Sequence, residues 1–129
     1  MSYTRTAAML MLFLFFLILS GPSGALPSES DVAQSEITYL LAHVEKSGCR
    51  FNRNGTWYND TKVIRQHMEA KYRYFQGKGR INSAEDFVER AASKSEMTGK
   101  PYLVKCTNGP EMPTAQWLID ELSRYRKEK

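Results

Sequence analysis

The sequence predicts an α+β fold, a small single domain in which a β-hairpin and a third short strand pack against about four helices, with one disulfide. Three observations predict it. Apolar residues recur at helical spacing in several segments, and Asn54-Gly55 between aromatic residues predicts a hairpin. Two cysteines lie in the part of the chain that follows the expected signal peptide. The 129 residues suffice for one domain and are too few for two.

The first 25 residues are typical of a secretory signal peptide. Arg5 is the only charge before an apolar run over residues 7–19, and a helix-breaking stretch of small residues then leads to Ala25. A membrane anchor is the alternative, but such a run spans only about 20 Å as a helix, against a hydrocarbon core of about 30 Å. We expect cleavage near Ala25 and a periplasmic or secreted protein with no stable membrane anchor.

The mature chain is expected to begin with a flexible leader, residues 26–34, and to continue as a single α+β domain over residues 35–129. Ser30 or Ser35 can cap a first helix that runs to about Lys46. Gly48 ends it. Its buried face is expected to contain residues at i, i+3, i+4 and i+7: Ile37, Leu40, Leu41 and Val44.

The strongest strand pattern surrounds Asn54-Gly55, which readily adopts the positive dihedral angles of a type I′ turn. Aromatic residues flank this turn on both sides, as in a hairpin: Phe51, Trp57 and Tyr58.

Two further helices are expected after the hairpin. Residues 59–61 cap the first of them, and its apolar residues lie between Val63 and Phe75. Gly77 and Gly79 end this helix. The second begins with a capping box, formed either by Asn82 with Glu85 or by Ser83 with Asp86, and its core face is Phe87, Val88 and Ala91.

The last elements are a short strand over residues 102–106 and a helix. The turn at residues 108–110 separates them, Thr114 is the expected cap of the helix, and residues 126–129 are expected to form a charged tail.

Cys49 and Cys106 are expected to form a disulfide, because the compartment is oxidising and the chain has no other cysteine. The bond would suit a first and a third strand that lie side by side and antiparallel. Catalysis by these thiols is not favoured, because redox-active cysteines are usually close in sequence. Cys49, Cys106 and the two histidines, His43 and His67, do not show the spacing of a known metal-ligand motif, so we expect no metal and no cofactor.

Several short motifs resemble a family of small exported bacterial proteins, domain of unknown function 5329. They lie between about Glu36 and Trp117 and are Cys49-Arg50-Phe51 with Arg53-Asn54-Gly55 and Tyr58, His67-Met68 with Lys71-Tyr72, Ala84-Glu85-Asp86-Phe87, and Ser95 with Gly99-Lys100-Pro101-Tyr102. The resemblance implies a bacterial, periplasmic or secreted protein and no established activity.

Three residues are the candidate binding site: Arg53, His67 and Lys71. Arg53 lies at a rigid strand end, where a guanidinium can bind a carboxylate or phosphate, although an internal ion pair would also explain it. His67 lies at the edge of an apolar stripe, one turn from Lys71, and is either a proton donor and acceptor or a packed boundary histidine.

The segment from Lys62 to Arg80 has six basic residues against one acid, Glu69, with aromatic residues between them. It is either an ordinary solvated face or a surface for an anionic envelope polymer, a lipid headgroup or another periplasmic protein. Without Arg5 the chain has 17 Lys and Arg against 14 Asp and Glu, a modest excess, and nucleic acid is not an expected partner.

The sequence therefore favours a small binding or interaction module for an anionic ligand. The alternative is a small secreted hydrolase that uses His67 as general acid or base and Lys71 or Arg53 to stabilise negative charge. No catalytic residue is assigned, because the sequence contains no nucleophile motif.

Overall fold

The computed structural model describes Gly21 and residues 24–129, and its core is an α+β domain of four helices and a four-stranded antiparallel sheet. The expected signal peptide lies almost entirely outside the described residues. The elements in chain order are α1 (Glu29–Lys46), β1 (Arg50–Arg53), β2 (Thr56–Tyr58), α2 (Thr61–Gly77), α3 (Ala84–Ala91), β3 (Leu103–Lys105), β4 (Glu111–Pro113) and α4 (Thr114–Lys127).

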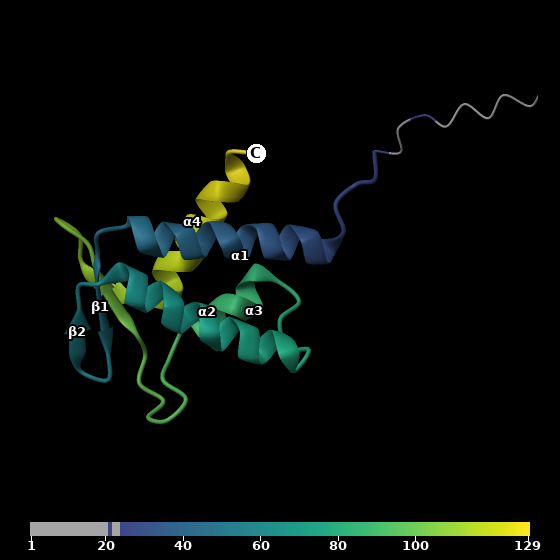
Figure 1. The fold of residues 1–129 in the computed structure, drawn as a ribbon. Coiled ribbons are helices and arrows are strands. Elements are labelled where there is room, and N and C mark those ends of the chain that lie inside the picture. Colours follow the sequence, from purple (N-terminus) through teal and green to yellow (C-terminus); the bar gives the residue numbers. More distant parts are fainter. Residues whose placement is uncertain (1–20, 22–23) are drawn as a thin grey trace, which may run out of the picture.

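The helices α1 and α2 lie side by side, with the sheet at one end and α4 passing behind them (Figure 1). The strand order is β2-β1-β3-β4. Side chains from all four helices and from the two central strands form one apolar core, with Leu40, Phe51, Phe87 and Leu118 among its most buried members. The predicted fold class is confirmed.

The hairpin turn and the disulfide follow the sequence prediction. Asn54 and Gly55 have φ angles of 53° and 88°, the positive values that a type I′ turn requires. Arg50 pairs with Lys105 in the antiparallel β1–β3 ladder, so Cys49 and Cys106 lie opposite each other just beyond it. Their sulfur atoms are bonded and their Cα atoms are 4.2 Å apart.

The start of the domain differs from the prediction. The helix α1 begins at Glu29, so helix occupies most of the segment 26–34 that we expected to be a flexible leader. Its cap is Ser28 rather than Ser30 or Ser35: the Ser28 hydroxyl accepts from the Asp31 N–H, and the Asp31 carboxylate accepts from the Ser28 N–H.

Three expectations for the second half of the chain also needed correction. The strand β4 was not expected, and it exists because Met112 pairs with Val104 of β3. Thr114 does not cap α4 with its side chain; it is fully buried, and its N–H donates to the carbonyl of Tyr102. The helix continues to Lys127, and Arg126, expected in a charged tail after the helix, pairs with the buried Glu36.

Candidate functional site

The three predicted site residues converge on one aromatic ring, that of Tyr102. The Arg53 guanidinium carbon lies 5.9 Å from its centroid, the Lys71 Nζ lies 5.1 Å from it, and the His67 ring meets it edge-on at 6.3 Å. Arg53 also lies 5.8 Å from the centre of the Tyr58 ring. These are cation–π distances, so the two tyrosines hold the cations in place. We call Arg53, His67, Lys71 and Tyr102 the Tyr102 cluster.

Three elements position the cluster. Arg53 ends β1 immediately before the tight turn, and His67 and Lys71 lie one turn apart on α2. Tyr102 precedes β3 and is 4% exposed. Its backbone N–H donates to the carbonyl of Ser93 and its carbonyl accepts from the Thr114 N–H, so the backbone of Tyr102 is bonded to the segment after α3 and to the start of α4.

The loop between α3 and β3 borders the cluster and is fastened to the hairpin turn. The side chain of Asn54 accepts a hydrogen bond from the Thr98 hydroxyl (2.6 Å) and donates one to the buried Ser95 hydroxyl (3.4 Å). Lys71 Nζ donates to the Lys94 carbonyl of this loop (2.9 Å) and lies 3.7 Å from a Glu96 carboxylate oxygen. One acid of the loop therefore offsets part of the positive charge.

Two nitrogen atoms in the cluster are buried without a hydrogen-bond partner: Nε of Arg53 and Nε2 of His67. They lie beside a cavity of only about 10 Å³, lined by Phe51, Arg53, Ile64, His67, Met68 and Tyr102. That volume is about the minimum for one water molecule. A ligand can therefore meet the cluster only at its outer edge.

Burial lowers the pKa of His67, and the nearby charges of Arg53 and Lys71 lower it further. The imidazole is therefore neutral at pH 7. Among the residues described, no carboxylate forms an ion pair with Arg53, so its guanidinium remains available for an anion from outside.

The basic excess between Lys62 and Arg80 is partly neutralised within the fold. Arg65 pairs with Glu45 of α1 at 2.6 Å, and Arg73 pairs with Glu69 one turn earlier at 2.8 Å. Together with the contact of Lys71 to Glu96, half of the six cations have an acidic neighbour. The segment is a weaker attractor of anions than its composition indicates.

A second polar cluster joins α1 to α4 and was not predicted. The Tyr39 hydroxyl donates to Glu121 at 2.5 Å, Arg124 donates to the same carboxylate, and His43 Nδ1 lies 3.5 Å from it. Burial alone would raise the pKa of Glu121, but the hydrogen bonds from Arg124 and Tyr39 outweigh it and lower the pKa. Burial lowers the pKa of His43. His43 also packs on Trp117, with ring centres 4.6 Å apart, so this cluster fastens the C-terminal helix to α1.

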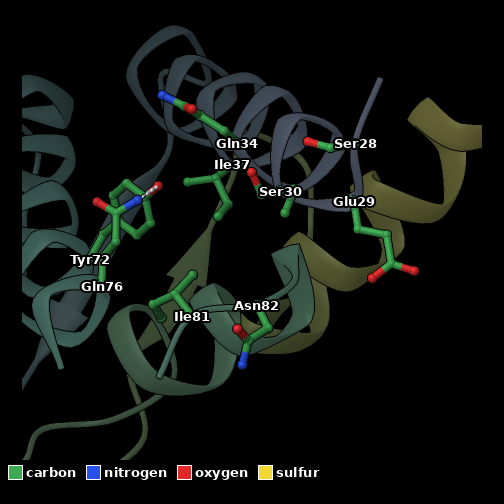
Figure 2. A pocket seen from close by; sticks show the side chains of 10 residues that line it. Ser28, Glu29, Ser30, Gln34, Ile37, Tyr72, Gln76, Ile81 and Asn82 are labelled. Atoms are coloured by element: carbon green, nitrogen blue, oxygen red, sulfur yellow. Dashed lines mark hydrogen bonds between the residues drawn. The ribbon is translucent and has the colours of Figure 1, made fainter. Parts of the chain in front are cut away.

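A groove of about 490 Å³ lies between the start of α1, the end of α2 and the segment before α3. Figure 2 shows Ile37 and Ile81 at its middle, Tyr72 and Gln76 at one end, and Glu29 and Asn82 at the other. This groove was not predicted from the sequence, because its walls come from three separate segments.

Residues 24–129 contain neither a metal-binding group of side chains nor a membrane-spanning helix. No group of three or more His, Cys, Asp and Glu side chains is arranged to hold a metal ion. No helix there combines the length and the apolar character needed to cross a membrane.

Comparison with known proteins gives the family. Residues 31–126 match the family of unknown function DUF5329. The chain belongs to this family. The match covers both clusters and most of the groove, and it confirms the resemblance recognised in the sequence motifs.

A curated relative is an uncharacterized protein, YfeK, of Salmonella typhimurium strain LT2. It is 36% identical over 63 residues, which is 49% of this chain and 50% of the relative. The chain thus matches about half the length of that relative. No solved structure matches.

Proposed function

We propose that this DUF5329 protein is an exported binding module that holds an anionic group of its ligand at the Tyr102 cluster. The observation that carries the proposal is the convergence of Arg53, His67 and Lys71 on one buried tyrosine. An anion at the outer edge of the cluster would accept hydrogen bonds from the Arg53 guanidinium and lie near Lys71.

The geometry also supports a rigid site. Arg53 is held between two tyrosine rings at the end of a strand, and the loop that borders it is hydrogen-bonded to the hairpin turn. Groups fixed in this way lose little side-chain entropy when a ligand binds. A carboxylate or phosphate is the class of group that fits.

The hydrolase alternative receives less support from the geometry. None of the six residues that line the cavity beside His67 carries a carboxylate, and the cavity is too small for a substrate. A neutral imidazole that lacks an acid to orient it is a weak general base. We therefore favour the binding module.

An NMR titration with inorganic phosphate tests the proposed site. Phosphate is expected to shift the ring signals of His67 and to raise the pKa of His67, because a nearby negative charge favours imidazolium. Arg53→Gln should weaken phosphate binding roughly tenfold or more, since hydrogen bonds to charged groups contribute about 1.5–3 kcal/mol.

The matched control is Arg80→Gln, which removes an exposed arginine outside the cluster. It should leave phosphate affinity almost unchanged. Equal losses in the two variants would indicate a diffuse surface effect. A His67 ring that stays neutral from pH 5 to 8 with and without phosphate would refute the assigned site.

Export is the second part of the proposal. The signal-peptide pattern and the Cys49–Cys106 disulfide both support it, because disulfides persist in oxidising compartments. The N-terminal residue of protein recovered from the periplasm of an expressing bacterium is expected to be Leu26. Recovery of the full-length chain from the cytoplasm alone would contradict export.

A further inference from the structure

The groove of about 490 Å³ between α1, α2 and the segment before α3 differs chemically from the Tyr102 cluster. Its volume lies within the range of about 300–1,000 Å³ that small-molecule sites occupy. Its lining contains no Lys, Arg or His, and its one charged side chain is Glu29. An anionic ligand therefore has no cation to meet here.

We propose that this groove binds a neutral polyhydroxylated chain, such as a short glycan. The side chains around it are mainly amides and hydroxyls, which both donate and accept hydrogen bonds as a sugar hydroxyl does. They are Ser28, Ser30, Gln34, Tyr72, Gln76 and Asn82.

The middle of the groove is apolar. Ile37 and Ala33 of α1 are buried side chains, and Ile81 packs against the core from the opposite wall (Figure 2). Tyr72 is held edge-on to Phe87, with ring centres 5.8 Å apart. A sugar ring presents C–H groups on its faces and hydroxyls at its edge, so an apolar floor with a polar rim matches both.

Several polar groups at the rim keep free capacity. Gln76 donates to the Tyr72 hydroxyl at 2.8 Å, which leaves the phenol hydrogen and the Gln76 carbonyl oxygen for a ligand. Asn82 uses its backbone N–H to bond Asp86, while its side-chain amide makes no hydrogen bond within the described part of the chain. The same holds for the amide of Gln34, which is exposed on α1. Each of these groups can pair with a hydroxyl at no cost to the fold.

The groove continues into a second hollow of about 330 Å³. Glu29, Ala33 and Asn82 line both, and Pro27 and Val32 extend the second one over the start of α1. A ligand of several linked rings can therefore bury more surface than a single ring. We infer a preference for an oligomer over a monomer.

The test is an NMR titration of the disulfide-bonded mature chain with three neutral trisaccharides, maltotriose, cellotriose and tri-N-acetylchitotriose. At least one is expected to shift amide signals at residues 28–37 and 72–82 at millimolar concentration, and to bind more tightly than its monosaccharide. Trigalacturonate, of the same length with three carboxylates, should not shift these signals, because Glu29 repels it.

Paired variants connect binding to the groove. Replacing Gln34 and Gln76 together by Ala should weaken trisaccharide binding several-fold, since a lost neutral hydrogen bond corresponds to roughly a two- to tenfold change. The control is Gln66→Ala, an exposed amide on α2 outside the groove, which should leave affinity unchanged. Both are surface changes, and equal melting temperatures would show that the fold is intact.

Two outcomes would overturn the inference: no shift with any of the three trisaccharides, or equal binding by the double variant and the wild type. Arg53→Gln separates this inference from the anion site, because that change should leave trisaccharide binding intact while it weakens phosphate binding.

Discussion

The ion pair between Arg126 and Glu36 gives the sharpest stability prediction. Glu36 is 4% exposed, and both of its carboxylate oxygens accept from Arg126, at 2.6 and 2.9 Å. Arg126 also donates to Glu85 at 2.5 Å, so one guanidinium joins α4 to α1 and α3. Arg126→Ala would leave a buried carboxylate without its partner.

The expected cost is about 2 kcal/mol. Breaking a fully buried pair typically costs about 3–5 kcal/mol, but the Arg126 side chain is 43% exposed, so water can partly replace the lost donors. For a domain of this size about 2 kcal/mol corresponds to a fall in melting temperature of roughly 8–16 °C.

Urea unfolding of the oxidised protein, followed by circular dichroism, measures this cost. The control is Arg73→Ala, whose pair with Glu69 lies on the surface with the arginine side chain 74% exposed, and which should cost less than about 0.5 kcal/mol. Adding Glu36→Leu to Arg126→Ala should recover much of the stability, because it removes the unpaired buried charge. A cost no larger than that of the control, or a double variant no more stable than Arg126→Ala, would refute this account of the contact.

Further predictions concern the disulfide, pH and salt. Replacing Cys49 and Cys106 by Ser should lower the free energy of unfolding by about 4 kcal/mol in the chain-entropy model, and finding two free thiols in periplasmic protein by mass spectrometry would contradict the disulfide. The pKa of His67 is lowered in the fold, so its contribution to stability is complete above about pH 6.5, the unfolded value, and is lost as pH falls toward the folded value. His67→Gln should flatten this acid-side loss in urea titrations at several pH values, and an unchanged slope would argue against the lowered pKa. The hydrogen bonds from Arg126 lower the pKa of Glu85, so this pair stabilises the fold above about pH 4.5 and the stabilisation is lost in more acid solution. Arg126→Ala should therefore make the free energy of unfolding depend less on pH in that acid range. Binding to anionic vesicles through the Lys62–Arg80 segment should be weak and should fall steeply between low and physiological salt, because exposed charges are screened over about 8 Å at 0.15 M; sedimentation of the protein with vesicles measures it, and salt-independent binding would exclude the electrostatic explanation.

The sequence determined those features that depend on neighbouring residues. Asn54-Gly55 fixes the hairpin turn because both residues adopt positive φ at low cost. The sequence allowed two caps for α3, and the one formed is Ser83, whose hydroxyl accepts from the Asp86 N–H. Apolar spacing gives the buried faces of the helices, except at Val63 of α2, which is exposed. Because the chain has only two cysteines, Cys49 and Cys106, only one intramolecular disulfide was possible. From these the α+β class and the antiparallel β1–β3 pair could be predicted.

The candidate site was only partly predictable. Residue type and position within an element pointed to Arg53, His67 and Lys71. The sequence indicated Tyr102 only as the first residue of a strand, although the other three side chains converge on its ring. The acids that neutralise Arg65 and Lys71 are 20 or more positions away along the chain. A count of charges along α2 therefore overstates the free positive charge.

Tertiary structure alone decided the features that join distant segments. The strand β4 is three residues long and ends in proline, and it is a strand because β3 offers it hydrogen-bond partners. Tyr39 meets Glu121 and Glu36 meets Arg126 across more than 80 positions, and the groove has walls from three elements. Local periodicity shows which face of a helix is buried but not which partner it meets, because the partner depends on how the helices pack around the common core.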